Sequence, residues 1–177
     1  MKLANYYKQA FTLIELLTVV AVLTILAGLI LPLSLKSISK AKSASCLQNL
    51  RQLGAGLQLY LSEHQMRLPL LEAGRLSKAE NLPVIDTLLL PYLRDSAVFK
   101  CPADNKIFKK SGTSYFWNTA LNGQSVSALN FLTLVEDNSR IPVLCDKEGW
   151  HKLSRSRVNF LYADGHVTEE LQLFATE

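Results

Sequence analysis

The feature that most constrains this chain is a long apolar run near its beginning. Residues 11–35 read FTLIELLTVVAVLTILAGLILPLSL and carry a single ionisable side chain, Glu15. A helix rises about 1.5 Å per residue, so the run is long enough to cross the roughly 30 Å apolar core of a bilayer. It is too long for the apolar part of a secretory signal peptide, which has about 7–15 residues. The run predicts a transmembrane helix, with a carboxylate that a plain anchor does not explain.

The basic charge of the chain is concentrated in its first third. The net charge is +4, yet the residues from 64 onward carry 13 basic and 13 acidic side chains, which cancel. A nucleic-acid-binding domain needs a basic face on its folded body. The charge distribution therefore argues against nucleic acid as a partner.

Beyond residue 35 the apolar pattern narrows to a stripe with helical spacing. The stripe consists of Cys46, Leu50, Leu53, Leu57 and Leu61. Apolar residues three and four apart lie on one face of a helix, so residues 36–64 are expected to form an amphipathic helix. Together with the apolar run this predicts one continuous helix from Phe11 to about Glu63. Gly54 and Gly56 are expected to mark close packing against the body.

The remaining residues, 65–177, are expected to form a small head. Residues 82–93 predict one short helix, capped near Asp86 and ended by Pro91. Aromatic and β-branched residues predict four strands. These strands are expected at 114–117, 141–145, 158–163 and 166–173. Asp164 and Gly165 separate the last two and favour a hairpin with a two-residue type I′ turn. The predicted fold class is therefore α+β, with a long helix packed on a small antiparallel sheet.

The string KQAFTLIELLTVVAVLTILAGLILP resembles the N-terminus of type IV pilins and type II secretion pseudopilins. Ala10 stands before Phe11, where the family usually has Gly, Glu15 is the fifth residue counted from Phe11, and Pro32 is the twenty-second. The resemblance implies that a prepilin peptidase cuts between Ala10 and Phe11 and that the new amino group is methylated. It also implies that Glu15 pairs with the Phe11 amine of a neighbouring subunit during assembly. Gly28 and Pro32 are expected to bend the helix.

The resemblance also implies an organisation and a location. Residues 1–10 would be a cytoplasmic leader, 11–35 a helix in the inner membrane, 36–64 an amphipathic helix, and 65–177 a periplasmic head. The implied partners are prepilin peptidase, other pilin or pseudopilin subunits, an inner-membrane assembly platform and membrane lipids. The implied function is that of a subunit of a type II secretion-like filament. Two alternatives stay open: a type IV pilus fibre for adhesion, motility or DNA uptake, and a membrane-anchored periplasmic binding domain that never polymerises.

The head resembles a subgroup of pseudopilin-like proteins. The matching stretches are CLQNLRQLGAGLQLYLSEHQMRLP, FKCPAD, SYFWNTALNG and VNFLYADGHV. The hallmark of that subgroup is a His followed after nine residues by Asp-Gly. Here Ser154, separated by nine residues from Asp164-Gly165, occupies the position of that His, and the nearest upstream His is His151, three residues earlier. A function assigned to the His of that motif therefore does not transfer directly, whereas the hairpin does.

Three cysteines, Cys46, Cys101 and Cys145, allow three single pairings. The resembling subgroup tends to carry Cys at the first two positions, which favours a Cys46–Cys101 disulfide. A Cys101–Cys145 disulfide and three reduced, buried thiols remain alternatives. No CxxC motif occurs in the sequence, so a zinc ribbon or a thioredoxin-like site is not expected.

The C-terminal third offers few residues for metal or enzyme chemistry. Asp146 and Asp164 are candidate calcium ligands, as in the C-terminal loop of major pseudopilins, but no EF-hand-like spacing is present. No other cofactor is expected. Ser154, His151 and Asp146 form a hydrolase-like set on paper. Nothing in their spacing supports that chemistry, and the chain is not expected to be an enzyme.

Overall fold

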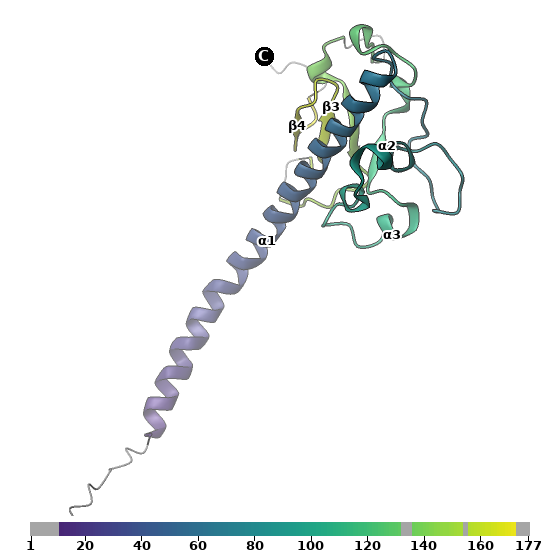
Figure 1. The fold of residues 1–177 in the computed structure, drawn as a ribbon. Coiled ribbons are helices and arrows are strands. Elements are labelled where there is room, and N and C mark those ends of the chain that lie inside the picture. The colour runs from purple at the N-terminus through teal and green to yellow at the C-terminus, as the bar shows by residue number, and fades with distance from the viewer. Residues whose placement is uncertain (1–10, 132–135, 154–155, 173–177) are drawn as a thin grey trace, which may run out of the picture. The chain divides into compact units, whose positions relative to one another are not determined.

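The computed structural model describes residues 11–131, 136–153 and 156–172 (Figure 1). The chain divides into two compact units, residues 1–38 and 39–177. A long N-terminal helix is followed by a small antiparallel sheet of four strands, so the predicted α+β, pilin-like fold is confirmed. Residues 1–10, which contain Ala10 and the expected leader, lie outside the described ranges.

The helix α1 runs from Leu13 to Glu63 as one element and includes Gly28 and Pro32. It ends where the backbone turns left-handed, at Gln65 (φ 54°) and Met66 (φ 56°). The Met66 N–H then donates to the carbonyl of Leu61 at 2.9 Å and closes the last turn. The predicted continuous helix is thus confirmed almost to the residue.

The amphipathic stripe of α1 is the centre of the core of the second unit. Its side chains are all buried: Cys46, Leu50, Leu53, Leu57 and Leu61. A Cβ on Gly54 would lie 3.1 Å from Leu161 of the sheet, and one on Gly56 would lie 3.0 Å from Leu93. Both distances are tighter than ordinary contact, so these glycines let the helix approach the body closely, as expected.

Two short helices lie between α1 and the sheet in the sequence, α2 at Ile85–Leu93 and α3 at Ile107–Ser111. Short 3-10 turns cover Ser96–Phe99, Thr119–Leu121, Val126–Ala128 and Asn138–Arg140. The predicted boundaries of α2 are wrong at both ends. Val84 precedes the first turn, and its N–H donates to Oγ1 of Thr87 at 3.2 Å. Asp86 is free to turn inward toward Arg75.

Pro91 lies inside α2 rather than at its end. A proline removes one N–H donor, but the following turn still closes because the Arg94 N–H donates to the Leu90 carbonyl at 2.9 Å. Arg94 then ends the helix in the left-handed region, at φ 59°. One missing donor near a helix end is therefore not enough to stop it.

The sheet follows the chain in the order β1-β2-β3-β4, and every neighbouring pair is antiparallel. The strands are β1 Tyr115–Trp117, β2 Pro142–Asp146, β3 Phe160–Tyr162 and β4 Val167–Thr168. All four strands were predicted in place, but the last two are much shorter than expected. Residue 173, the end of the strand expected at 166–173, lies outside the described ranges.

The β3–β4 turn differs from the predicted type I′ turn. Gly165 has a positive φ of 92°, but Asp164 is not among the residues with positive φ. The Gly165 N–H donates to the Tyr162 carbonyl at 2.9 Å, and the Tyr162 N–H donates to the His166 carbonyl at 3.0 Å. This is a three-residue loop with glycine at its left-handed position. Asp164 instead accepts a hydrogen bond from the His166 N–H at 3.0 Å through its side chain, which favours the ordinary backbone conformation.

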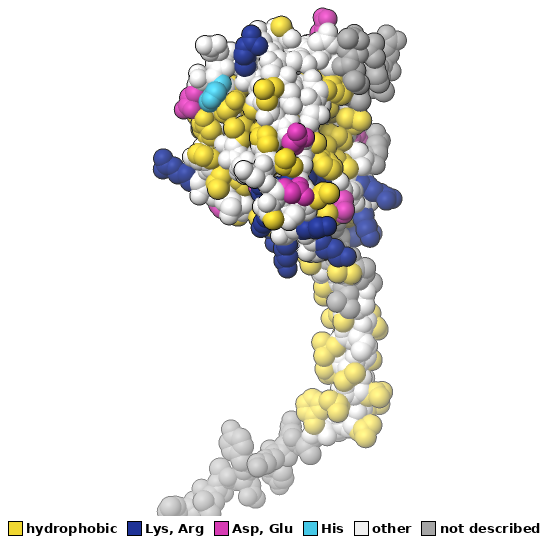
Figure 2. All heavy atoms as spheres, turned by 90° about the vertical axis from the view of Figure 1, so that its right-hand side faces the viewer, with side chains coloured by type: hydrophobic (Ala, Val, Ile, Leu, Met, Phe, Trp, Pro, Cys, Tyr) yellow, Lys and Arg dark blue, Asp and Glu magenta, His cyan; other side chains and the backbone are white. Residues whose placement is uncertain are grey.

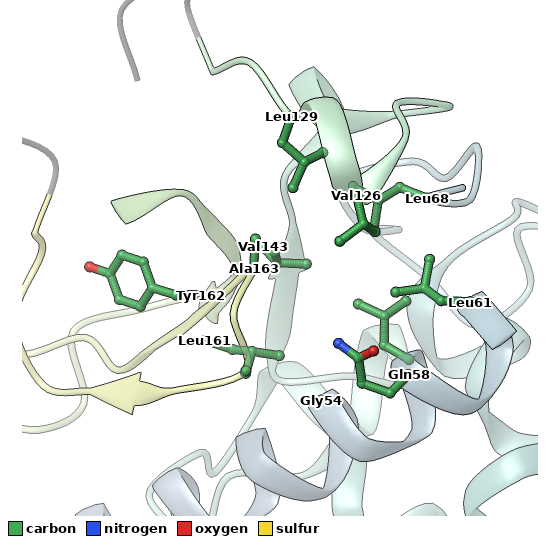
Figure 3. A pocket seen from close by; sticks show the side chains of 12 residues that line it. Gly54, Gln58, Leu61, Leu68, Val126, Leu129, Val143, Leu161, Tyr162 and Ala163 are labelled. Atoms are coloured by element: carbon green, nitrogen blue, oxygen red, sulfur yellow. The ribbon is translucent and has the colours of Figure 1, made fainter. Parts of the chain in front are cut away.

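The space between α1 and the sheet is nearly filled. Leu61, Val143 and Leu161 point toward one another across it (Figure 3), and the remaining cavity measures about 10 Å³. That is room for about one water molecule. The interior beneath the helix therefore serves packing and offers no space for a larger ligand.

Within the part of the chain that the structure describes, no helix combines the length and the apolar character needed to cross a membrane.

Candidate functional site

The first turn of α1 is closed by a reciprocal pair, Thr12 and Glu15. The Glu15 N–H donates to Oγ1 of Thr12 at 3.3 Å, and the Thr12 N–H donates to Oε2 of Glu15 at 2.8 Å. The Thr12 hydroxyl also donates to the same carboxylate oxygen at 2.7 Å. This is a capping box, in which a Thr before the helix and a Glu three residues later satisfy each other's N–H groups. The T-x-x-E spacing before an apolar run is the sequence signal for this capping box, which was not among the predicted features.

The side chains that follow this cap are apolar and exposed. Phe11 is 74% exposed and Leu13 84% exposed, and the pattern continues to Ile30 at 60%. Figure 2 shows apolar side chains following one another along this segment. Nothing among the described residues covers them. The side chain of Pro32, which the resemblance places at the twenty-second position of the assembly helix, lies outside what the structure describes.

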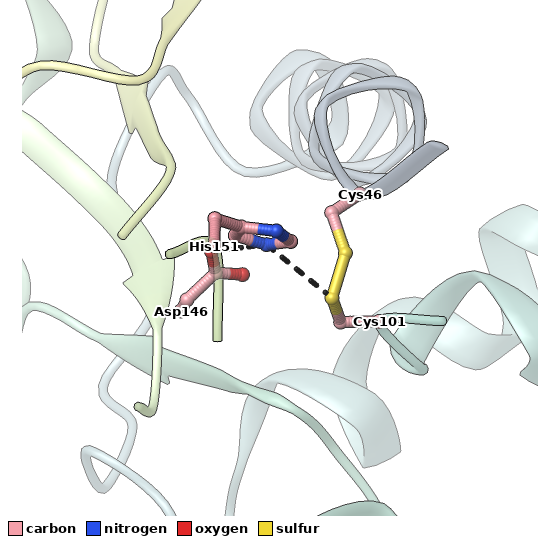
Figure 4. A group of neighbouring side chains, drawn as sticks. All are labelled: Cys46, Cys101, Asp146 and His151. Atoms are coloured by element: carbon pink, nitrogen blue, oxygen red, sulfur yellow. Dashed lines mark hydrogen bonds and ion pairs between the residues drawn. A yellow bond between two sulfur atoms is a disulfide. The ribbon is translucent and has the colours of Figure 1, made fainter. Parts of the chain in front are cut away.

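A second group of side chains is buried in the head. Cys46 on α1 and Cys101 form a disulfide, the pairing that the resemblance favours, and Cys145 is free. Nε2 of His151 lies 3.5 Å from Sγ of Cys101 and 3.2 Å from Oδ2 of Asp146. Figure 4 shows the imidazole facing the disulfide, with the carboxylate of Asp146 close beside the ring. The sequence suggested Cys46 with Cys101 as a disulfide and His151 with Asp146 in a hydrolase-like set, but not that the two pairs meet.

The carboxylate of Asp146 lies at the end of β2 and is almost fully buried. Burial raises the pKa of Asp146 above its usual value, against the opposing effect of hydrogen bonds from His151 and from the Asn159 N–H at 2.8 Å. Its other oxygen, Oδ1, has no hydrogen-bond partner among the described residues. The site thus holds a carboxylate that its neighbours compensate only in part.

The FKCPAD stretch forms the loop that carries Cys101, and hydrogen bonds to Asp104 hold this loop in place. Asp104 accepts hydrogen bonds from the N–H groups of Lys106, Ile107 and Phe108 at 2.7–2.8 Å and so caps α3. Ser114 donates to Asp104 and accepts from the Cys101 N–H at 3.0 Å. One carboxylate therefore fixes the loop that presents Cys101 to α1.

The two candidate calcium ligands belong to different surroundings. Asp164 lies on the β3–β4 turn and binds the side chain of its neighbour His166, with Nδ1 and Oδ1 2.6 Å apart. Among the described residues, the group able to hold a metal ion contains Asp146 with Cys46, Cys101 and His151, and does not contain Asp164. The hydrolase-like set is only partly described, because Ser154 lies outside the described residues.

The comparison with family models found one match, a prokaryotic N-terminal methylation motif at residues 5–31. Comparisons with curated proteins and with solved structures found no match. The motif confirms the predicted resemblance to the prepilin-type N-terminus of type IV pilins and pseudopilins. It indicates a substrate of prepilin peptidase and a structural subunit rather than an enzyme, associated with a membrane or an extracellular filament.

Proposed function

We propose that this chain is a structural subunit of a type II secretion-like periplasmic filament. In this proposal a prepilin peptidase cuts between Ala10 and Phe11, and the new Phe11 amine is methylated. The observation that carries the proposal is the methylation motif at residues 5–31 on a helix whose apolar side chains are exposed. An inner-membrane assembly platform would then add the subunit to the filament, with the head on the periplasmic side.

The exposed apolar side chains supply the driving force for assembly. Burying an exposed Leu, Ile or Val side chain stabilises by about 1.5–3 kcal/mol. The side chains between Phe11 and Ile30 are about half to four-fifths exposed, so helices of neighbouring subunits have much apolar area to cover. Before assembly, lipid at the inner membrane would shield the same area.

Glu15 sets the register in this proposal. After cleavage the Phe11 amine is a cation, and a carboxylate removed from water is tolerated when a cation pairs with it. Glu15 of one subunit would meet the Phe11 amine of the next. In the single chain its carboxylate is occupied by Thr12, so assembly would exchange part of the capping box for the ion pair.

The first test measures the intact mass of the protein from membranes, with and without active prepilin peptidase. Loss of the first ten residues and one added methyl group on Phe11 supports the proposal. A chain that starts at Met1 in both strains contradicts it. Loss of secretion in a deletion strain, with motility and adhesion intact, supports the secretion filament, and the reverse result favours a pilus fibre.

The second test separates the charge of Glu15 from its capping role. Gln caps a helix as Glu does, so Glu15→Gln keeps the cap and removes the charge. Thr12→Ala removes the cap and keeps the charge. Filament incorporation, measured by crosslinking between subunits, should fail in Glu15→Gln and persist in Thr12→Ala. The opposite pattern would mean that Glu15 acts only as a cap.

A further inference from the structure

We propose that Cys46, Cys101, Asp146 and His151 form a Zn²⁺ site whenever the two cysteines are reduced. The disulfide and the zinc centre are then two alternative links between α1 and the head at one place. This inference is independent of the filament proposal, because it concerns only the buried contact between Cys46 of α1 and the head.

The separation of the four ligand atoms fits this metal. Both sulfur atoms, a His151 nitrogen and an Asp146 oxygen lie within 4.8 Å of one another, and all four side chains are buried. Zinc binds Cys, His and Asp tetrahedrally, with bonds of about 2.0–2.3 Å. Neighbouring ligand atoms in such a tetrahedron are about 3.3–3.8 Å apart. Opening the disulfide and moving the ligands by small amounts is enough to reach that arrangement.

The orientation of His151 points to a metal rather than to hydrogen bonding alone. One nitrogen, Nε2, faces both Sγ of Cys101 at 3.5 Å and Oδ2 of Asp146 at 3.2 Å. An N–H aimed at two acceptors serves neither well, and a disulfide sulfur is a weak acceptor. As a lone pair, the same nitrogen would converge with the thiolates and the carboxylate on one ion between them (Figure 4).

The carboxylate gives an independent indication. Asp146 is 2% exposed, and its Oδ1 has no hydrogen-bond partner within the described residues. A buried carboxylate is costly unless a cation or hydrogen bonds compensate it. The Asn159 N–H holds Oδ2 in place at 2.8 Å, as outer partners of metal ligands commonly do. Zinc would supply the missing positive charge.

An entry route reaches the site from the surface. A pocket of about 240 Å³ is lined by His151 together with Ser43, Lys40 and Glu169. The Ser43 hydroxyl donates to Oε1 of Glu169 at 2.8 Å across it. His151 therefore belongs both to the lining of this pocket and to the buried cluster, so the pocket is the side from which an ion would approach.

The two states differ by a balanced exchange. Zinc binding to the newly made chain displaces one proton from each thiol and forms two zinc–sulfur bonds. Formation of the disulfide transfers two electrons from the thiolates to a disulfide oxidant and releases the ion. A phosphine reverses this step in vitro: it takes up oxygen from water as a phosphine oxide, and the disulfide becomes two thiols.

The test uses the full-length chain in detergent, reduced with a phosphine without oxygen, and measures zinc bound per chain after gel filtration. The reduced chain should bind one Zn²⁺, and the oxidised chain none. Co²⁺ added in place of zinc should give thiolate-to-cobalt charge-transfer absorption. His151→Ala and Asp146→Asn should each lower zinc affinity by at least about tenfold, the smallest loss typical even for an outer partner of a metal ligand.

The chain supplies matched controls. His166→Ala and Asp164→Asn alter the surface His–Asp pair, and Cys145→Ser alters the free thiol; all three should bind zinc as the unsubstituted chain does. If reduction unfolds the head, restoration of its circular dichroism by zinc supports the site. The proposal is overturned if the reduced chain binds no zinc, if zinc does not restore a head unfolded by reduction, or if removing His151 and Asp146 leaves the affinity unchanged.

Discussion

The hydroxyl of Ser114 donates a hydrogen bond of 2.6 Å to Oδ2 of Asp104. This contact joins the loop after Cys101 to the residue before β1, while the same carboxylate caps α3. Burial alone would raise the pKa of Asp104. The hydrogen bonds from Ser114 and from three backbone N–H groups outweigh burial and hold the pKa of Asp104 below its usual value of 3.8.

Asp104→Ala should lower the free energy of unfolding by about 2 kcal/mol, because it removes a cap and leaves buried donors unpaired. The lowered pKa fixes the direction of the pH effect. The stabilisation is complete above the unfolded pKa near 3.8 and is lost as pH falls through the folded pKa. Urea unfolding between neutral and acid pH measures both. In Asp104→Asn the free energy of unfolding should fall less steeply as the pH decreases. An unchanged slope would contradict the assignment of this pH dependence to Asp104.

Asp95 provides the matched control for that measurement. It caps the first 3-10 turn by accepting from the Ala97 N–H alone, at 2.8 Å, and it is exposed. Asp95→Ala should therefore cost about 0.5 kcal/mol, at the low end for a cap. Equal losses in the two variants would show that the hydrogen bond from Ser114 and the two additional N–H contacts of Asp104 contribute nothing.

A second prediction concerns the ion pair between Arg75 and Asp86. Both side chains are largely buried, with Nη2 and Oδ2 2.5 Å apart. Arg75→Met should destabilise by about 3–5 kcal/mol, because it removes the cation that is paired directly with a buried carboxylate. The double variant Arg75→Met, Asp86→Leu should recover most of that loss. Denaturant unfolding of the two single variants and the double variant completes a double-mutant cycle. If the losses in the free energy of unfolding were purely additive, Arg75 and Asp86 would not be coupled.

The same pair has a pH dependence of opposite sign to that of Asp104. Burial raises the pKa of Asp86, and this outweighs the attraction of Arg75. The stability contributed by a group with a raised folded pKa is present below its unfolded pKa and is lost as pH rises through the folded value. Arg75→Met should therefore recover stability on acidification. Persistence of this recovery after adding Asp86→Asn would assign it to another group.

Most of the fold was predictable from the periodicity of apolar residues and from local composition. The spacing of the Cys46–Leu61 stripe depends only on helix geometry, so the long helix and its buried face were predictable. The strands were predicted because their residue types suit a pleated sheet. The lengths of the strands were not predicted, because a strand ends where its hydrogen-bonded neighbour ends, and that neighbour is distant in the sequence. Pro91 and Asp164 were misread for a related reason: local preferences yield when a neighbouring turn or side chain satisfies the backbone.

The buried cluster shows the limit of reading a sequence one residue at a time. Asp146 and His151 are near each other in sequence, but Cys46 and Cys101 come from distant segments. Only the packing of α1 on the sheet brings them together. Their burial and shared nitrogen contact are tertiary properties. The Thr12–Glu15 box, in contrast, was local and readable from its spacing.

A third prediction distinguishes the cysteines. Replacing Cys46 and Cys101 together by Ser should lower stability by about 4 kcal/mol, from the chain entropy of a loop of this length, given the sequence separation of 55. Cys145 is the free cysteine, and burial together with nearby Asp146 raises the pKa of its thiol from 9.0 to about 11. Its thiolate fraction at neutral pH, and so its alkylation rate, should be about 100-fold below that of an ordinary thiol. Mass spectrometry after iodoacetamide treatment measures this rate, and fast labelling would contradict the burial.

The last prediction compares two glycines with nearly the same φ angle. Gly112 has φ 89° and Gly165 has φ 92°, a region that other residues enter only with strain. At Gly165 a Cβ would meet nothing within 4 Å, whereas at Gly112 it would lie 2.5 Å from Nη2 of Arg75 and 2.6 Å from Oδ2 of Asp86. Gly165→Ala should therefore cost about 1 kcal/mol from strain alone.

Gly112→Ala should cost at least about 3 kcal/mol, because its methyl group would push apart a buried ion pair. Thermal unfolding of the two variants side by side measures the difference, with strain acting as the shared background. In the Arg75→Met, Asp86→Leu double variant the side chains next to Gly112 are apolar and no charges need to stay paired. There Gly112→Ala should exceed Gly165→Ala in lost stability by less than it does in the unsubstituted chain. Equal losses at the two glycines in the unsubstituted chain would mean that the ion pair moves aside freely, and that it does not hold α2 against the α3 loop.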